Sequence, residues 1–206
     1  MDDRHETAER ASDDLAGLLY TSGTTGRSKG AMITHGNLAS NAGTLVKLWA
    51  MTDRDVLLHA LPIFHVHGLY VALNTAFLSG GEIIWFAKFD AKAVIAAMPA
   101  ATVMMGVPTF YTRLLGEDAL TREAAANMRL FISGSAPLLA ETHRAFSVRT
   151  GHAILERYGM TETGMITSNP HDGARVPGTV GFALPDVSVR IQGEQPGVLE
   201  VSGPNV

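Results

Sequence analysis

Apolar and polar positions follow two alternating patterns along most of the chain. Short apolar runs, typical of buried parallel strands, occur at residues 15–20, 55–60, 82–86, 102–105, 130–133 and 154–158. Between them lie segments with helical spacing, as at Leu38, Ala42, Leu45 and Trp49. Further helices are predicted over Gly68–Leu78, from an N-cap at Asp90 to about Met98, and over Leu138–Arg149. This order predicts a layered α/β fold, with a mainly parallel sheet flanked by helices.

The pattern changes after Asn169. Val187, Val189 and Ile191 alternate with polar residues, and a turn at residues 193–197 precedes a second alternating run. This predicts an antiparallel hairpin that begins a small β subdomain. We therefore divide the chain into a solvated lead-in (1–14), an α/β core (15–170) and the start of a β subdomain (171–206). Because two strands alone are marginally stable, we expect an incomplete domain, cut from a longer protein.

Composition and charge exclude several classes of function. The 206 residues are 46% hydrophobic, which excludes a disordered tail. The net charge of −4 equals that of residues 1–14 alone, so no basic face for nucleic acid or anionic lipid is expected. The absence of cysteine excludes thiolate nucleophiles and disulfides. No apolar run is long enough to span a membrane and the start is too polar for a signal peptide, so we expect a cytoplasmic location.

The first chemical motif is the string YTSGTTGRSKG at residues 20–30. Its glycines allow close backbone approach, and its hydroxyls and Lys29 supply donors, so such a loop can wrap a polyphosphate. It does not fit the Walker pattern, because no glycine directly precedes Lys29. A flexible exposed loop is the alternative interpretation.

The second motif is ERYGMTET at residues 156–163. If both motifs follow parallel strands, their loops face one crevice at the carboxyl edge of the sheet. A carboxylate beside hydroxyls suits Mg²⁺, which is usually held by one or two carboxylates together with substrate phosphates. The alternative is a helix N-terminus capped by Thr161.

These strings, in this order, resemble the adenylate-forming superfamily of acyl-CoA synthetases, luciferases and peptide-synthetase adenylation domains. PIFHVHG (62–68), SGSAPL (133–138), GTVG (178–181) and GVLEVSGP (197–204) resemble further segments of that family, so the likeness covers nearly all of residues 15–206. The resemblance implies that Mg-ATP and a carboxylic acid give an acyl-adenylate and pyrophosphate. The acyl group then passes to a thiol, usually that of coenzyme A.

The resemblance also implies roles for individual residues. His65, Lys29, Thr161 and Glu162 would be catalytic: His65 beside the reacting carboxylate, Thr161 at the α-phosphate and Glu162 on Mg²⁺. The loop around the β and γ phosphates would comprise Thr21, Ser22, Gly23, Thr24, Thr25, Gly26 and Lys29. The adenine would be flanked by Ser133, Gly134, Ser135, Ala136, Pro137, Tyr158 and Gly159. A ribose-binding aspartate, a hinge and a C-terminal domain with a catalytic lysine would follow residue 206, so we expect this chain alone to turn over poorly.

The acid is predicted from the strings LLHALPIFHVHGL and MGVPTFYTRLL, which most resemble malonyl-CoA synthetases. Arg113 and His59 interrupt apolar surroundings there. A buried arginine needs a partner, and a second carboxylate on the substrate would supply one in bidentate geometry. We therefore expect malonate or a methyl-substituted malonate, with a pocket that comprises His59, His67, Arg113, Gly134 and Met160.

Several alternatives remain open at this point. Arg113 and Glu117 have the spacing of a plain surface pair on a helix. A zinc site formed by His59, His65 and His67 is disfavoured, because the chain has neither cysteine nor an HExxH arrangement. The chain could also belong to a sibling enzyme that activates a different acid. A non-catalytic nucleotide-binding remnant is the alternative from a different class.

Overall fold

The computed structural model describes residues 7–21, 28–193 and 196–206. Its centre is a seven-stranded sheet with the order β4-β3-β5-β6-β7-β8-β9. Neighbours from β4 to β7 are parallel, and β7-β8 and β8-β9 are antiparallel. The strands are β3 (Val56–His59), β4 (Glu82–Trp85), β5 (Val103–Gly106), β6 (Leu130–Ser133), β7 (Leu155–Met160), β8 (Gly164–Ser168) and β9 (Phe182–Ala183).

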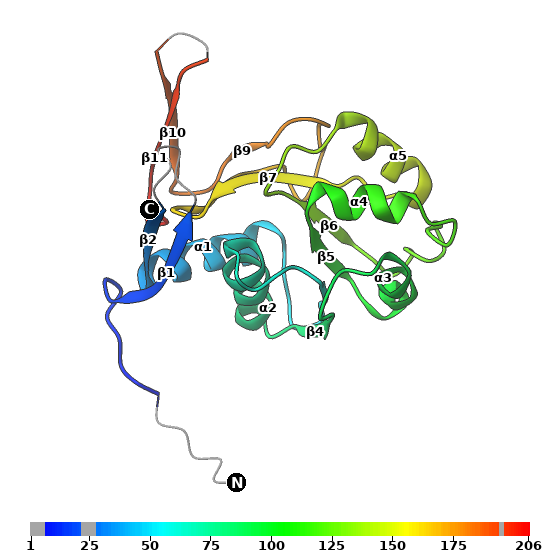
Figure 1. Cartoon of the computed structure of the whole chain (residues 1–206), viewed down its shortest axis with the longest axis horizontal. Coiled ribbons are helices and arrows are strands. Elements are labelled where there is room, and N and C mark those ends of the chain that lie inside the picture. Colours follow the sequence, from blue (N-terminus) through cyan, green and yellow to red (C-terminus); the bar gives the residue numbers. More distant parts are fainter. Residues whose placement is uncertain (1–6, 22–27, 194–195) are drawn as a thin grey trace.

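Helices cover both faces of this sheet, with α1 and α2 on one side and α3, α4 and α5 on the other (Figure 1). They are α1 (His35–Leu48), α2 (Leu73–Ser79), α3 (Ala91–Ala97), α4 (Pro108–Leu115) and α5 (Ala140–Thr150), with a π-helical turn (His67–Ala72) and a 3₁₀ turn (Met98–Ala100). Every residue of β5 and β6 is buried, as expected for strands covered on both faces. The predicted α/β architecture is confirmed.

Local signals set the helix starts. Thr34 and Asn37 form a capping box at α1, with Asn37 N–H donating to Thr34 Oγ1 at 3.1 Å and Thr34 N–H donating to Asn37 Oδ1 at 3.0 Å. The predicted N-cap at Asp90 is confirmed, because its Oδ1 accepts the Ala93 N–H at 2.9 Å. The caps satisfy backbone donors that the helices leave unpaired.

Aromatic side chains pack together in the core between the sheet and helices α4 and α5. Tyr111 and Phe131 both pack edge-on against Phe146, with ring centroids 5.3 and 4.9 Å apart. The Tyr111 hydroxyl donates to the Ile132 carbonyl at 2.6 Å, which satisfies its buried polar atom. On the other side, Trp49 donates to Ser168 Oγ at 3.1 Å and ties α1 to β8.

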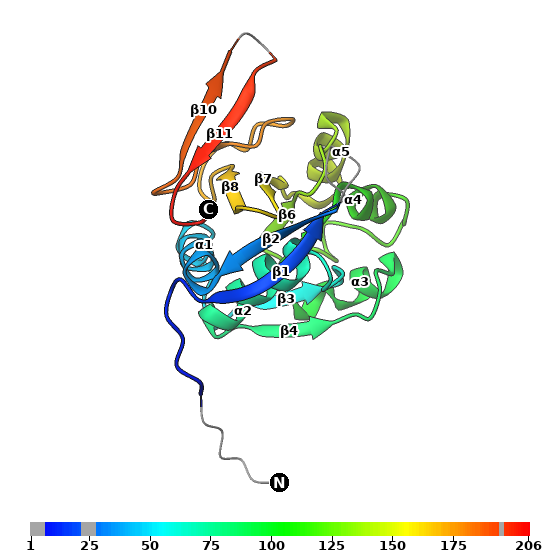
Figure 2. The same ribbon diagram turned by 60° about the vertical axis from the view of Figure 1, so that its left-hand side comes forward.

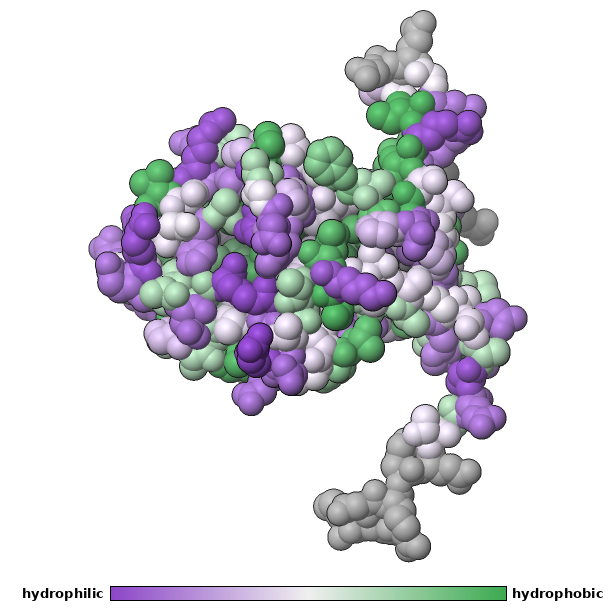
Figure 3. Space-filling view, turned by 180° about the vertical axis from the view of Figure 1, so that it is seen from behind, coloured by the Kyte–Doolittle hydropathy of each residue, from purple (hydrophilic) through white to green (hydrophobic). Residues whose placement is uncertain are grey.

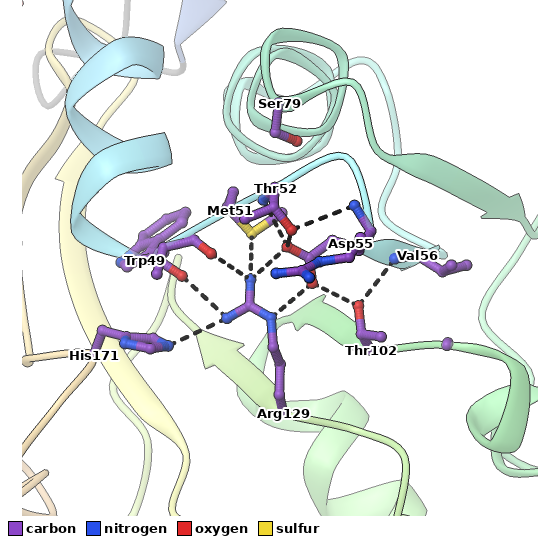
Figure 4. Close-up of polar contacts among 12 residues, drawn as sticks. Trp49, Met51, Thr52, Asp55, Val56, Ser79, Thr102, Arg129 and His171 are labelled. Carbon is purple, nitrogen blue, oxygen red and sulfur yellow. Dashed lines mark hydrogen bonds and ion pairs between the residues drawn. The ribbon is translucent and has the colours of Figure 1, made fainter.

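A polar cluster joins the amino ends of three parallel strands (Figure 4). Asp55 precedes β3, Thr102 precedes β5 and Arg129 precedes β6. The Asp55 carboxylate accepts bonds from Arg129 Nε and Nη2, both at 2.6 Å, and from Thr102 Oγ1 at 2.8 Å. Burial acts to raise the pKa of Asp55, but the hydrogen bonds from Arg129, Thr52 and Thr102 outweigh burial and lower it.

The first predicted strand is placed differently from the expectation. Strand β1 (Leu15–Thr21) pairs antiparallel with β2 (Lys29–Thr34), and the two form a separate two-stranded sheet. The prediction that this strand belongs to the parallel sheet was wrong, and β2 was missed. Both strands keep many positions exposed, so β2 lacks the continuous apolar run that marked the central strands.

The second correction concerns residues 161–168. The chain does not start a helix at Thr161 but turns back as β8, antiparallel to β7. Gly164 makes the reversal possible with a φ of +60°, a conformation that glycine adopts without strain. The four apolar and hydroxyl residues after this glycine were too short a run to predict β8.

The C-terminal hairpin was predicted correctly. Strands β10 (Ser188–Gln192) and β11 (Val198–Ser202) pair antiparallel and project from the body of the molecule (Figure 2). Apolar side chains lie along this hairpin (Figure 3), and Ile191 and Val198 are 58% and 66% exposed. Strand β9 joins the main sheet, and the three-part division of the chain stays a prediction. Within the described ranges, the helices are too short or too polar to cross a membrane.

Candidate functional site

Two neighbouring cavities open where the parallel strands end. The first has a volume of about 390 Å³ and is lined by Leu61, Pro62, His65, Val66, His67, Gly68, Val107, Ser135, Arg157, Gly159, Met160, Thr161 and Met165. The second, of about 280 Å³, is lined by Ser133, Ser135, Ala136, Pro137, Leu138, Glu156, Arg157, Tyr158, Gly159, Gly178 and Val180. The residues that line both are Ser135, Arg157 and Gly159. A crevice is therefore present at the carboxyl edge of the sheet, and the second motif lines it. That the first motif faces the same crevice stays a prediction.

A histidine and a serine face each other in the first cavity. His67 begins the π-helical turn and is buried, with its Nδ1 3.1 Å from Ser135 Oγ. Ser135 has a φ of +70°, an uncommon conformation for a residue with a side chain, and such strain is concentrated at functional sites. Burial, and then the nearby Arg157, hold the pKa of His67 well below its ordinary value. His67 is therefore a neutral imidazole at pH 7.

Arg157 is the buried cation of this site. The residue is 3% exposed, and its Nε and Nη2 atoms have no hydrogen-bond partner among the described residues. Burial lowers its pKa to about 9. Gly134 makes room for the guanidinium, because a Cβ at that position would lie 2.3 Å from Arg157 Cζ. A buried cation without a counter-charge is costly, so this site favours an anion.

The second cavity has a carboxylate at its base. Glu156 is buried, and its Oε1 accepts the Gly178 N–H at 2.9 Å. Burial raises the pKa of Glu156, which outweighs the opposite effect of that bond. Ser133 lies beside it, and its hydroxyl has no partner among the described residues. The cavity therefore offers polar groups beneath apolar walls, a common arrangement for ligand pockets.

The turn between β7 and β8 carries Thr161 and Glu162. Thr161 lines the first cavity and Glu162 is exposed. Among the described residues no three histidine, aspartate or glutamate side chains gather as a metal site. One accessible carboxylate beside a hydroxyl suits Mg²⁺ that reaches the protein with substrate phosphates, because this ion keeps several ligands that the protein does not supply.

The glycine-rich motif begins and ends on the small sheet. Thr21, the last residue of β1, is paired in register with Lys29, the first residue of β2. Lys29 is exposed. The predicted phosphate-loop residues Ser22, Gly23, Thr24, Thr25 and Gly26 lie outside the described residues.

Of the five predicted acid-binding residues, the structure brings His67 and Met160 to the first cavity and leaves His59, Arg113 and Gly134 outside its lining. His65, His67 and Met160 line the first cavity. His59 is buried outside the cavity lining, with its ring centroid 4.6 Å from that of Trp85. Arg113 is exposed on α4, with its guanidinium 4.8 Å from the centroid of Phe89, and it too is outside the lining. The expectation that Arg113 and His59 face the pocket is not met here.

Sequence reasoning missed Arg157 and Glu156 as individual site residues. Both belong to the string that was singled out, but they were interpreted as part of a strand. The available signal was a pair of charged residues next to the apolar run Ile154-Leu155. Charged side chains at buried strand positions are rare unless they are paired or bind something.

Comparisons with known proteins agree with this geometry. The family described as AMP-binding enzyme matches residues 2–206. The mitochondrial malonate–CoA ligase of Mus musculus is 44% identical over 200 residues, which cover 89% of this chain and 34% of that protein. The malonate–CoA ligase of Arabidopsis thaliana is 38% identical over 215 residues, with 95% and 35% covered. This chain thus spans about a third of the length of these relatives.

Solved structures show the same fold. The ATP-bound crystal structure of MatB from Rhodopseudomonas palustris has a TM-score of 0.94 and 59% identity, and the match covers 98% of this chain and 42% of that one. A malonyl-CoA ligase solved with methylmalonyl-CoA and AMP has a TM-score of 0.89 and 38% identity, with 98% and 47% covered. The chain therefore belongs to the family of AMP-binding enzymes.

Proposed function

We propose that this chain forms the nucleotide- and acid-binding part of an ATP-dependent acid–thiol ligase that activates malonate or a methyl-substituted malonate. In the proposed reaction, an acid oxygen attacks the α-phosphorus of ATP, the new P–O bond forms and the bond to pyrophosphate breaks. The acyl group of the adenylate then passes to the thiol of coenzyme A, and AMP leaves. The relatives named as malonate–CoA ligases support this proposal.

The chain's own residues would divide these tasks between the two cavities. The adenine would occupy the second cavity, against Tyr158 and the segment 133–137, and the acid would occupy the first. Thr161 and His65 line the first cavity and would donate to oxygens on which negative charge develops. Lys29 would neutralise the leaving phosphates. Glu162 would hold Mg²⁺, whose chemistry is to stabilise the charge on those phosphates.

The observation that carries the choice of acid is the unpaired Arg157 guanidinium beside the first cavity. Malonate has a second carboxylate that can pair with it, whereas acetate and longer monocarboxylic acids leave it without a counter-charge. Because leaving one partner of a buried charge pair alone costs several kcal/mol, this difference is large enough to select the acid. His67 and Ser135 would complete the anion site as neutral donors.

The test is a calorimetric titration with non-hydrolysable malonyl-, acetyl- and octanoyl-adenylate mimics. We expect the wild-type chain to prefer the malonyl compound. Arg157→Met should weaken malonyl binding at least about tenfold and leave acetyl binding nearly unchanged, whereas Arg113→Ala should change neither. If Arg113→Ala selectively lost malonyl binding and Arg157→Met did not, Arg113 would be the residue that binds the second carboxylate. That result would contradict the proposal.

A further inference from the structure

Two buried asparagines hold the turn that carries Thr161 and Glu162. Asn41 lies on α1 and is 9% exposed, and Asn205 lies after β11 and is 3% exposed. They come from opposite ends of the chain, yet both reach the backbone of residues 163–165. Neither residue lines the two cavities of the candidate site.

Asn41 makes a two-point contact with Met165. Its Nδ2 donates to the Met165 carbonyl at 2.9 Å, and its Oδ1 accepts the Met165 N–H at 3.0 Å. Gly164 lies directly against this amide, because a Cβ there would be 2.6 Å from Asn41 Oδ1. The amide therefore fits a turn whose glycine has a φ of +60°.

Asn205 holds the same turn from the other side. Its Nδ2 donates to the carbonyl of Thr163 at 2.9 Å and to that of Met165 at 3.3 Å. The segment around it is fixed on α1, where Asn37 Nδ2 donates to the carbonyls of Pro204 and Val206 at 3.1 and 3.0 Å. Figure 2 shows the C-terminus beside α1 and β8. The end of the hairpin is thus connected to the backbone next to Glu162.

We propose that Asn41 and Asn205 are positioning residues that orient the Thr161–Glu162 turn toward magnesium-bound nucleotide. This inference rests on the proposed function. The Glu162 side chain is exposed, so only its backbone can fix where the carboxylate lies. Each bond from the asparagines ends one to three residues beyond Glu162. Loss of these bonds frees the turn, and a displaced carboxylate holds the ion less well.

The test measures the binding of a non-hydrolysable ATP analogue by calorimetry, with Mg²⁺ and with EDTA. Asn41→Leu nearly keeps the side-chain volume and removes both hydrogen bonds to Met165. Asn205→Ala removes the hydrogen bonds to the carbonyls of Thr163 and Met165. Each variant should weaken binding about three- to tenfold with Mg²⁺ and leave binding in EDTA nearly unchanged. Asn127→Ala is a control away from the site: Asn127 is exposed, and its Nδ2 also donates to a backbone carbonyl, that of Ala101 at 2.9 Å.

A double-mutant cycle shows whether the asparagines act through Glu162. In a Glu162→Gln background, where the metal ligand is already lost, Asn205→Ala should have no further effect on Mg²⁺-dependent binding. Thermal melting should show a larger loss of stability in Asn205→Ala than in Asn127→Ala, because Asn205 is buried and Asn127 is exposed. A wild-type chain without Mg²⁺-dependent binding would contradict the proposed function and this role together. The positioning role alone would be contradicted by any of three results. These are an equal loss of affinity with Mg²⁺ and with EDTA, the same loss of affinity in Asn127→Ala, or additive effects in the cycle.

Discussion

At the scale of single residues, the site depends on a glycine as much as on its charged groups. Gly134 lies over the Arg157 guanidinium, and an added methyl group would be 2.3 Å from Arg157 Cζ and Nη1. Such an approach forces one group to move, and the guanidinium has the cavity to move into. Gly134 thus sets where the cation lies, although it has no side chain to contact a ligand.

We therefore expect Gly134→Ala to reduce selectivity before it unfolds the protein. The overpacking should cost about 1–3 kcal/mol of unfolding free energy. Binding of a malonyl-adenylate mimic should fall about tenfold while an acetyl mimic binds as before, as calorimetry can measure. Gly43→Ala is the control, because no atom lies within 4 Å of its added Cβ and it is within α1. That control should stabilise the chain by about 0.5–1 kcal/mol. Unchanged malonyl selectivity in Gly134→Ala would show that Arg157 need not occupy its present position.

At the residue scale, sequence motifs identified residues that line the first cavity, but they could not identify which charged side chains are buried. His65, His67 and Thr161 were predicted from their motifs, and all three line the first cavity. The sequence alone could not show which of Arg113 and Arg157 lies in the site, because both interrupt apolar strings. Only the fold shows that Arg113 lies on an exposed face of α4 while Arg157 is buried under the loop after β6.

At the scale of elements, the cluster around Asp55 connects strand starts that are far apart in sequence. Arg129 donates to Asp55, to the carbonyls of Trp49 and Ala50, and contacts His171 Nε2 at 3.2 Å. The loops before β3, β5 and β6 thus depend on one carboxylate. Because Asp55 is 3% exposed, removing its charge leaves Arg129 with an incomplete set of partners.

Asp55→Asn should lower the free energy of unfolding by about 2–3 kcal/mol at pH 7, measured by urea denaturation. The folded-state pKa of Asp55 is lowered, so the carboxylate's contribution is fully present above the unfolded value of about 3.9. It is lost as pH falls through the folded pKa. The difference between wild type and variant should therefore be constant from pH 6 to 8 and shrink below about pH 4. Asp118→Asn, at an exposed carboxylate away from this cluster, should leave the midpoint of urea denaturation unchanged. A difference that grew on acidification would contradict this account.

The elements themselves were predicted well where one face or both faces are buried. Helix α1 and strands β3, β5 and β6 have the apolar spacing that burial imposes. Strands β2, β8 and β9 were missed, because they are short, interrupted by glycine or exposed. Their places are set by pairing: β2 with β1, β8 with β7 and β9 with β8. Single-sequence patterns contain no information on such partners.

At the scale of the whole molecule, the strands differ in how well they are protected from solvent. The centre of the sheet is enclosed by helices on both faces, whereas β10 is exposed at every position. A two-stranded hairpin has little stability of its own, so β10 and β11 should open locally without global unfolding.

Hydrogen exchange should show this gradient directly. Amides of β5 and β6 should exchange only through global unfolding, and those of β10 and β11 at least about a hundredfold faster, because local opening costs much less free energy. Urea should not slow hydrogen exchange at any amide of β10–β11. It should accelerate hydrogen exchange at the amides of β5–β6. Protection of the hairpin equal to that of β6 would mean that another surface covers it, and sedimentation would then show self-association.

The wall between the two cavities has a thermodynamic consequence. Ser135, in the loop after β6, and Arg157 and Gly159, on β7, border both cavities, so a ligand in either cavity can contact the same residues. If nucleotide occupancy changes the affinity for the acid by some factor, the acid must change the affinity for nucleotide by the same factor. A charged ligand in one cavity would interact with the same Arg157 guanidinium as a ligand in the other cavity, so the two would compete for it. Under the proposed function, Arg157 would therefore couple the binding of nucleotide to the binding of the acid.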